Sequence, residues 1–156
     1  MPPVNDPNYN AMRQEWQQGE FVISTDPARL DVETVYHYLA HESYWATGRT
    51  REMIQCSIAN SLGFGLYKGK RQAGFCRVVT DYATFAWLCD VFVLEPFRGL
   101  GLSKWMMEVA TSHPKLQGVR RWMLGTKDAQ ELYRKYGFTE VNPSVRWMER
   151  VTELAH

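Results

Sequence analysis

The chain has 156 residues, of which 45% are hydrophobic and 22% are charged, and its 18 Lys and Arg residues nearly balance its 17 Asp and Glu residues. This length predicts one globular domain that buries a core without disulfides or a structural metal, and the balanced charge argues against nucleic acid as a main partner. No segment approaches the roughly 18 continuous apolar residues of a membrane span, so a membrane is not expected as a partner. The three cysteines show no Cys-x-x-Cys or Cys/His spacing, so a metal is not expected either.

The first third of the chain predicts one strand and two helices. Residues 1–15 are polar and rich in proline, so we expect a loosely held extension before a single domain at 16–156. Residues 20–24 read as a strand. Asp31 is a good N-cap for a helix with one apolar face, and Thr50 is a good N-cap for a second helix.

Three strand signals follow and predict an antiparallel meander. Residues 64–67 and 73–80 are apolar and separated by a glycine-containing turn, which is typical of a hairpin. Residues 84–94 form a longer apolar run that suits a central strand.

The second half predicts alternating helices and strands. A helix begins near residue 102, because apolar residues recur there with helical spacing: Leu102, Trp105, Met106, Val109 and Ala110. Residues 119–126 predict a strand, Asp128 with Glu131 resembles a capping box that starts another helix, and Gly137 suits its end. Residues 144–151 alternate as a final strand. The whole pattern predicts an α/β (α+β) fold with a mixed, mostly antiparallel sheet of about six or seven strands and about four helices.

The segment 91–106 joins an apolar strand, a glycine-rich turn and a helix, which is a common phosphate-binding arrangement. The nucleotide-triphosphate loop does not fit, because Lys104 stands at the wrong distance from the glycines. The dinucleotide fingerprint does not fit either. Lys104 occupies its third glycine position, and Arg120 and Arg121 stand where an acidic residue is needed.

Two sequence motifs indicate which other kind of phosphate-binding site the chain resembles. Residues 98–103, "RGLGLS", resemble the R/Q-x-x-G-x-G/A signature of the GCN5-related N-acetyltransferase (GNAT) superfamily, and residues 128–138, "DAQELYRKYGF", resemble its second cofactor motif. Their order and separation also match, so the chain resembles a small, single-domain, bacterial-type member. Two departures are Ser103, where Gly or Ala is usual, and Thr126, where many members carry an Asn that contacts pantetheine.

The resemblance implies acetyl-CoA as co-substrate. Backbone N–H groups of residues 98–103 would bind the pyrophosphate, and the strand edge at 92–94 would pair with pantetheine and polarise the thioester carbonyl. The residues expected to contact the cofactor are Phe92, Val93, Leu94, Arg98, Gly99, Leu100, Gly101, Leu102, Ser103, Thr126, Ala129 and Tyr133.

The resemblance also implies Tyr133 as the general acid that protonates the departing thiolate, with Tyr136 left to the core. The alternative is that Tyr133 is itself a core residue. Asp90 interrupts an apolar strand, on the same face as Leu88 and Phe92 by alternation, and is the candidate base or amine-orienting group. The alternatives are a structural Asp90 satisfied by a neighbouring backbone group or by an arginine, or a water chain that carries the proton.

The acceptor is expected at the connection between the first two helices, residues 41–50. Tyr44 and Trp45 could line an apolar pocket, and Arg49 or Arg51 could hold a carboxylate. The alternative is that these aromatic residues close the core and the arginines are solvated.

These expectations describe a cytoplasmic N-acetyltransferase that moves an acetyl group to a small-molecule amine in a ternary complex. Acetylation of protein N-termini or lysines, or a non-catalytic acyl-CoA-binding module, are the alternatives. The three cysteines, Cys56, Cys76 and Cys89, are expected to be reduced and buried, and no neighbour would activate Cys89 for an acetyl-cysteine route. Six tryptophans suggest aromatic surface that a possible homodimer would cover.

Overall fold

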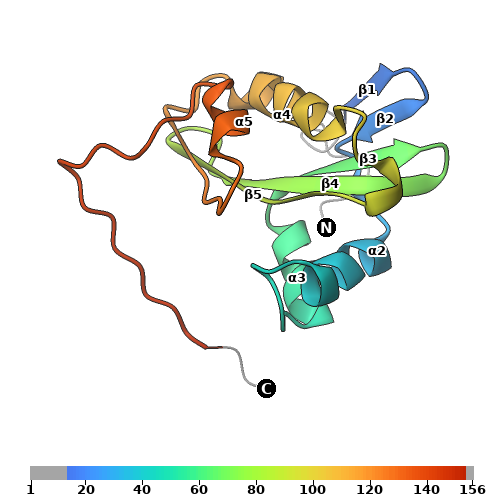
Figure 1. Ribbon diagram of the computed structural model, residues 1–156, viewed down its shortest axis with the longest axis horizontal. Coiled ribbons are helices and arrows are strands. Elements are labelled where there is room, and N and C mark those ends of the chain that lie inside the picture. Colours follow the sequence, from blue (N-terminus) through green and yellow to red (C-terminus); the bar gives the residue numbers. More distant parts are fainter. Residues whose placement is uncertain (1–13, 154–156) are drawn as a thin grey trace.

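The computed structural model describes residues 14–153, so most of the expected extension at 1–15 lies outside the described residues (Figure 1). Six strands form one sheet in chain order: β1 (Glu15–Gln18), β2 (Phe21–Ser24), β3 (Leu62–Lys68), β4 (Arg71–Thr80), β5 (Phe85–Val93) and β6 (Arg121–Met123). The pairs from β1 to β5 are antiparallel, and β5 and β6 are parallel. This confirms the predicted mixed, mostly antiparallel sheet, and it adds β1, which the sequence did not suggest.

The helices are α2 (Val32–His37), α3 (Arg51–Ala59), α4 (Leu102–Ser112) and α5 (Gln130–Arg134), with short 3-10 or π turns at Pro27–Arg29, Tyr38–Glu42, Glu95–Phe97 and Pro114–Leu116. Both predicted N-caps are confirmed. The Asp31 carboxylate accepts from the Thr34 N–H, and the Thr50 hydroxyl accepts from the Met53 N–H, each at 3.2 Å. None of these described helices is long and apolar enough to cross a membrane.

The sheet lies between two helical layers, with α2 and α3 on one face and α4 and α5 on the other (Figure 1). The predicted apolar face of α4 is buried in the larger core cluster, together with residues of β3, β4 and β5. A second cluster joins Val35 of α2 and Ile54 of α3 to Phe75 and Phe92 of the sheet. Because both faces of the sheet are covered, its central strands are apolar almost throughout.

A β-bulge interrupts the pairing of β4 with β5. Phe75 pairs with Phe92, but Arg77 pairs with Cys89, so residues 90–91 of β5 stand opposite a single residue of β4. Such a bulge bends the strand and increases its local twist. The backbone of β5 is therefore redirected at the residue that the sequence singled out as a candidate base.

The bulge corrects the predicted orientation of Asp90. Alternation placed Leu88 and Phe92 on one face, but Leu88 lies in the cluster with α4, and Phe92 lies in the cluster with α2 and α3. Asp90 adopts a left-handed backbone conformation with φ of 54°, which is uncommon for residues other than glycine although Asp tolerates it better than most. The inserted residue breaks the period of two on which the prediction depended.

Helix α5 begins later than predicted. Its N-cap is Ala129, and the capping box proposed at Asp128 is not formed. The Thr126 hydroxyl instead accepts from the Ala129 N–H at 3.0 Å. The helix ends at Arg134 with Lys135 as its C-cap, so Gly137 lies one position beyond the C′ position predicted for it. Gly137 has a positive φ of 88°, and the Phe138 N–H donates to the Tyr133 carbonyl.

The predicted final strand at 144–151 is wrong for this chain as the structure describes it. These residues are exposed, are not part of a helix or strand, and run away from the body of the molecule (Figure 1). An alternating sequence forms a strand only when a neighbouring strand satisfies its backbone groups, and no described strand lies alongside this segment.

His113 gives the fold a pH dependence. It is buried between the rings of Trp16 and Phe64, its Nδ1 accepts from the Lys115 N–H at 3.2 Å, and its Nε2 has no hydrogen-bond partner among the described residues. Burial, and then the charge of Lys115, lower the pKa of His113 below its ordinary value of 6.5. The unfolded chain therefore takes up a proton more readily than the folded chain, so the free energy of unfolding should fall as pH drops below about 6.5.

We expect His113→Phe to remove this part of the acid sensitivity, because a phenyl ring fits the aromatic site and does not titrate. Chemical denaturation at about pH 7.5 and about pH 5.5 measures the change in the free energy of unfolding. His37→Phe is the control, since His37 is exposed. An equal pH dependence in both variants would contradict this account.

Candidate active site

A gap opens where β5 and β6 diverge. Their parallel pairing runs from Phe85 and Arg121 to Trp87 and Met123, after which β6 ends while β5 continues to Val93. A cavity of about 520 Å³ occupies this gap and extends toward the segment between α2 and α3. Its lining residues are Tyr44, Trp45, Arg49, Arg77, Trp87, Leu88, Cys89, Asp90, Val91, Leu124, Gly125, Thr126, Lys127, Asp128, Ala129 and Tyr133.

A buried ionic cluster forms one end of the cavity. Asp90 is only 3% exposed. Its carboxylate accepts from Arg77 Nε at 2.6 Å, from Arg49 Nη1 at 2.9 and 3.0 Å, and from Trp45 Nε1 at 2.9 Å. Burial alone would raise the pKa of the Asp90 carboxyl, but the hydrogen bonds and positive charges of Arg77 and Arg49 outweigh it and hold the pKa below its ordinary value.

These contacts bear on the role of Asp90. A carboxylate that already accepts from three side chains, and that two guanidinium groups hold ionised, is a weak proton acceptor. The geometry therefore favours the structural alternative, in which Asp90 fixes the positions of Arg49 and Trp45 at the cavity wall. Its assignment as the base stays a prediction.

The predicted acceptor residues Tyr44, Trp45 and Arg49 all line this cavity. The Tyr44 and Trp45 rings meet edge to face with centroids 5.1 Å apart, and the Tyr44 hydroxyl accepts from the Lys127 N–H at 3.3 Å. This last contact joins the α2–α3 connection to the loop after β6. The two segments, far apart in sequence, thus enclose one end of the cavity with aromatic side chains, to which Trp87 adds a third.

Arg51, the other candidate for holding a carboxylate, lies outside the cavity. Its guanidinium forms two hydrogen bonds with Glu33, at 2.8 and 2.9 Å, and stacks over the Tyr36 ring at 4.5 Å. Arg51 therefore links the start of α3 to α2 on the surface.

Tyr133 on α5 stands on the cavity wall formed by the second motif. It is half-buried, and burial raises the pKa of its hydroxyl to about 12. No group among residues 14–153 hydrogen-bonds this hydroxyl, so it is free to donate to a ligand. Tyr136 contacts the core cluster instead, with its hydroxyl donating to the Lys104 carbonyl at 3.1 Å.

The glycine-rich loop ends in the N-terminus of α4. Gly99 and Gly101 have positive φ angles of 81° and 74°, and a Cβ atom built on either glycine would meet no atom within 4 Å. Gly101 is the N-cap and offers no side chain to the free N–H groups of the first turn. The loop is thus an open, glycine-lined site with the positive end of an eleven-residue helix behind it, which suits a phosphate group.

Hydrogen bonds within the strand before this loop limit which of its backbone groups can contact pantetheine. The Leu94 N–H donates to the Ala73 carbonyl at 2.8 Å, so it cannot polarise a thioester. Since successive N–H groups of a strand point to opposite edges, the Val93 N–H points toward the gap. The Arg98 side chain donates back to the Val93 carbonyl at 2.9 Å and to the Tyr38 hydroxyl at 3.3 Å, which braces the loop.

Several other predicted cofactor residues have side chains that pack in the core or face solvent. Phe92 stacks on Tyr38 with ring centroids 4.1 Å apart, and Leu102 is buried in the core, so their side chains serve packing. Leu100 is exposed, and Ser103 is half-buried in the first turn of α4. These residues can therefore contact a cofactor chiefly through their backbone.

The cysteines differ from expectation in one case. Cys76 is buried and Cys89 is partly buried, but Cys56 is exposed on α3. Burial raises the pKa of the Cys89 thiol, which lines the cavity, to about 11. The thiol is therefore protonated at neutral pH and is a poor nucleophile, which agrees with direct transfer.

Sequence reasoning did not assign several cavity residues to the site, among them Arg77, Trp87 and Lys127. Arg77 had a usable signal, because it is a charge within the apolar run of β4, just as Asp90 is within β5. Two opposite charges in neighbouring strands of a meander are candidates for a buried pair. Trp87 and Lys127 carried no comparable signal.

Comparisons with known proteins agree with this geometry. The family model described as "Acetyltransferase (GNAT) domain" matches residues 59–140. A Gibberella zeae protein, FG08082, named as a proposed acetyltransferase, is 31% identical over 144 residues, which cover 78% of this chain and 80% of that protein. A crystal structure from Xanthomonas campestris pv. campestris, described as a proposed GNAT-family acetyltransferase, is 42% identical, covers 87% of this chain and 96% of its own, and has a TM-score of 0.83.

A more distant crystal structure comes from Clostridium acetobutylicum and is described as a "predicted acetyltransferase with acetyl-CoA". It is 13% identical, covers 77% of this chain and 86% of its own, and has a TM-score of 0.58. At this identity the likeness extends to the fold alone.

Proposed function

Because the chain belongs to the GNAT family of acetyltransferases, we propose that it transfers the acetyl group of acetyl-CoA to a primary amine of a small molecule by direct attack in a ternary complex. The observation that carries this proposal is the cavity between β5 and β6. One side of it presents the Tyr133 hydroxyl, which has no hydrogen-bond partner within residues 14–153, and its other end presents aromatic side chains and Arg49.

The residues around the gap suit acetyl-CoA. The open loop at 98–103 and the N-terminus of α4 would bind the pyrophosphate through backbone N–H groups. The unpaired edge of β5 beyond Trp87 would pair with the pantetheine arm, and Thr126 and Ala129 would border that arm from the other side. Acetyl-CoA supplies an activated acyl group as a thioester.

The protein's own groups would then serve three tasks. The Val93 N–H would donate to the carbonyl oxygen as negative charge develops there. As the amine nitrogen forms its bond to the acyl carbon and the carbon–sulfur bond breaks, the Tyr133 hydroxyl would give its proton to the departing sulfur. The proton lost by the amine would leave through a water chain or through Asp90.

A small acceptor fits the cavity better than a protein segment. The contact of Tyr44 with Lys127 bridges the cavity end that the acceptor would enter, and Trp45 and Arg49 are held in place by Asp90. A peptide chain would need a continuous open groove there. Arg49 would orient an acceptor that carries an anionic group beside its amine.

A screen of small amines and amine-bearing peptides, with free CoA detected as a thiol, tests the acceptor class. We expect at least one small primary amine to raise CoA release above the rate of hydrolysis. Acetylation confined to peptides or proteins would overturn the small-molecule assignment.

A matched pair of glycine substitutions tests the cofactor loop. Gly101 and Gly69 both have positive φ, and both have open space around the Cβ position, but Gly69 lies in the β3–β4 turn. Alanine at either position should cost about 1 kcal/mol of stability through backbone strain. We expect only Gly101→Ala to weaken acetyl-CoA binding, by about tenfold, because it also displaces the N–H groups of the loop.

Isothermal titration with acetyl-CoA measures the two dissociation constants, and thermal unfolding measures the two stabilities. Equal dissociation constants for Gly101→Ala and Gly69→Ala would remove the loop from the cofactor site.

A further inference from the structure

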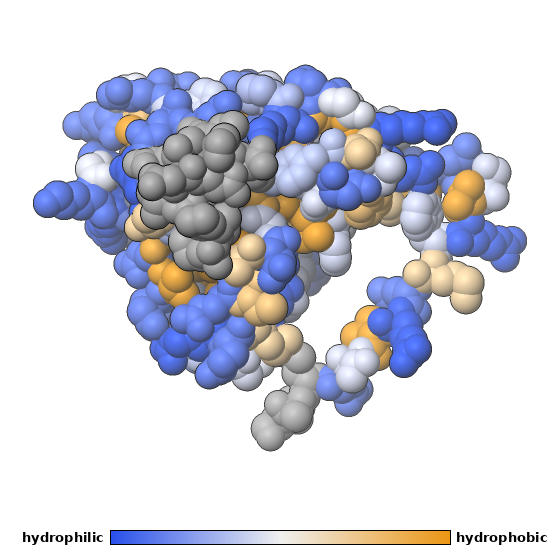
Figure 2. Space-filling view, turned by 180° about the vertical axis from the view of Figure 1, so that it is seen from behind, coloured by the Kyte–Doolittle hydropathy of each residue, from blue (hydrophilic) through white to orange (hydrophobic). Residues whose placement is uncertain are grey.

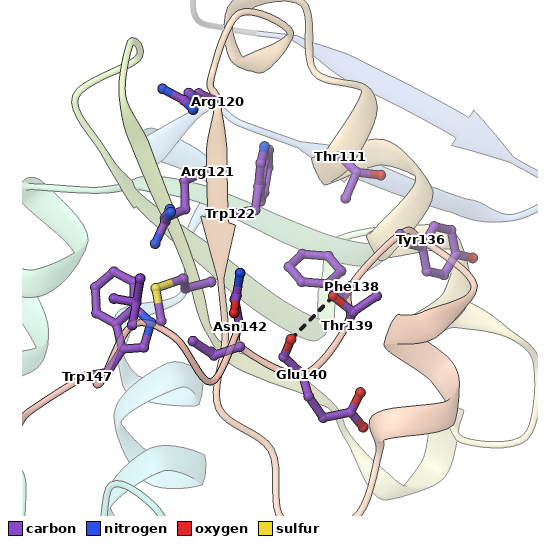
Figure 3. Close-up of a pocket in the computed structure, with 14 residues that line it drawn as sticks. Thr111, Arg120, Arg121, Trp122, Tyr136, Phe138, Thr139, Glu140, Asn142 and Trp147 are labelled. Carbon is purple, nitrogen blue, oxygen red and sulfur yellow. Dashed lines mark hydrogen bonds between the residues drawn. The ribbon is translucent and has the colours of Figure 1, made fainter.

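The outer edge of β6 is exposed beside a groove. One edge of β6 pairs with β5, and the other faces a hollow of about 540 Å³. Figure 3 shows Arg120, Arg121 and Trp122 along one side of this hollow, with Phe138, Thr139 and Asn142 nearby. Among residues 14–153, no strand occupies this edge, so its outward backbone groups lack a ladder partner.

The C-terminal arm, residues 144–153, does not fill the groove of its own chain. Val145 and Trp147 form part of the wall, and the Arg121 guanidinium lies over the Trp147 ring at 5.0 Å. Beyond Trp147 the arm turns away from the body, and Figure 2 shows it as a separate string of polar and apolar residues. Met148 is 95% exposed and Val151 is 74% exposed.

The arm has the composition of a strand that needs a partner. Val145, Trp147 and Val151 lie at odd positions, which would place them on one face of an extended segment. Together with Met148 and Val141, they make up half of the large hydrophobic side chains that are exposed among the described residues. Apolar side chains gathered on a single projecting segment are typical of an interaction site.

The arm carries charges of both signs, with Arg146 and Arg150 beside Glu149 and Glu153. Arg120 stands at the β6 side of the groove without an acidic partner among the described residues, and Glu149 in the arm has no basic partner there. The arm and the edge of β6 are complementary in hydrogen bonding and in apolar surface, yet the arm leads away from the edge in its own chain (Figure 1).

We propose that the arm of one copy pairs with the outer edge of β6 in a second copy, so that the protein forms an arm-exchanged dimer. Each copy offers the outer edge of β6 and one arm, and a two-fold axis pairs each arm with the β6 edge of the other copy and closes the assembly. The exchange adds a seventh strand to each sheet. It also supports the candidate site, because β6 leads directly into the loop at 124–129 that lines the cavity.

The test compares the full chain with a variant truncated after Asn142 and with the double variant Arg146→Pro/Glu149→Pro. The two proline positions differ in parity, so one proline removes a ladder N–H whichever edge of the arm pairs. Arg146→Ala/Glu149→Ala is the matched control. Light scattering after gel filtration should show twice the 18.2 kDa chain mass for the full chain and the alanine control, and a single chain mass for the truncated and proline variants.

Amide hydrogen exchange distinguishes the arm-exchanged dimer from other arrangements of the arm. In the full chain, amides of residues 121–123 and 144–151 should be protected together and lose protection on dilution, while the other strands stay protected in every variant. A monomeric full chain, or a truncated variant that still dimerises, would overturn the proposal. Protection that persists in a monomer would also overturn it, because the arm would then fold onto its own β6. Protection of the arm without β6 would overturn it as well, because two arms would then pair with each other.

Discussion

Replacing Tyr133 with Phe is expected to lower kcat about 100-fold, with little change in the dissociation constant for acetyl-CoA. The substitution keeps the ring that packs beside Phe138 and removes only the hydroxyl that faces the cavity. A tyrosine hydroxyl is already protonated at neutral pH, and burial raises the pKa of Tyr133 further, to about 12, so a proton is present at the cavity wall for the departing sulfur. Steady-state CoA release with a confirmed acceptor measures the effect.

Tyr136→Phe is the matched control for this experiment, since it removes a hydroxyl that donates to the Lys104 carbonyl outside the cavity. We expect its kcat to stay within a few fold of the wild type. Unchanged turnover in Tyr133→Phe would refute the general-acid role. The wild-type rate should also show no loss from deprotonation of this phenol below about pH 10.

Asp90→Ala is expected to lower the free energy of unfolding by about 3–5 kcal/mol, as is typical when one partner of a buried ion pair is removed. The Arg77 side chain is 11% exposed and that of Arg49 is 24% exposed, so both guanidiniums would lose their shared carboxylate where water reaches them poorly. Alanine would also have to adopt the positive φ of this bulge position. Denaturation with urea measures the loss.

Glu33→Ala is the control, because it breaks only the exposed ion pair with Arg51 and should lower the free energy of unfolding far less than Asp90→Ala. Similar losses in the two variants would contradict the account of the buried cluster. The pKa of Asp90 is lowered in the folded chain, so the stability that it contributes is present above its ordinary pKa of 3.8 and is lost as pH falls through the lower folded value.

The elements with strong local signals could be predicted from the sequence. The apolar residues of α4 recur with helical spacing over a long segment, and all of them are buried in the structure. Asp31 and Thr50 cap helices as expected, because N-capping depends on a side chain and a backbone N–H only a few residues apart. The glycines at 99 and 101 have the positive φ angles for which glycine is best suited.

What could not be predicted depends on contacts distant in sequence. Strand β1, "EWQQ", has one apolar residue, and it forms a strand because β2 offers it an edge. The bulge at Asp90 follows from pairing with β4 and from three side-chain donors of the α2–α3 connection and β4. The arm at 144–151 has a strand pattern, but whether a strand forms depends on which edge is available to it.

The gap between β5 and β6 had no signal of its own in the sequence. It arises because β6 stops at Met123 while β5 continues, and the length of a pairing is a property of both strands. The aromatic end of the cavity likewise depends on the contact between Tyr44 and Lys127, which are 83 residues apart. The motifs at 98–103 and 128–138 predict which residues contact the cofactor, whereas the shape of the cavity came from the folded chain.

A crystal structure of the protein with acetyl-CoA tests the central claim most directly. The account predicts the pyrophosphate at the N–H groups of residues 98–103, the pantetheine arm along the free edge of β5, and the thioester sulfur within hydrogen-bond reach of the Tyr133 hydroxyl. A cofactor bound elsewhere, or a thioester that lies away from Tyr133 and the gap between β5 and β6, would contradict it.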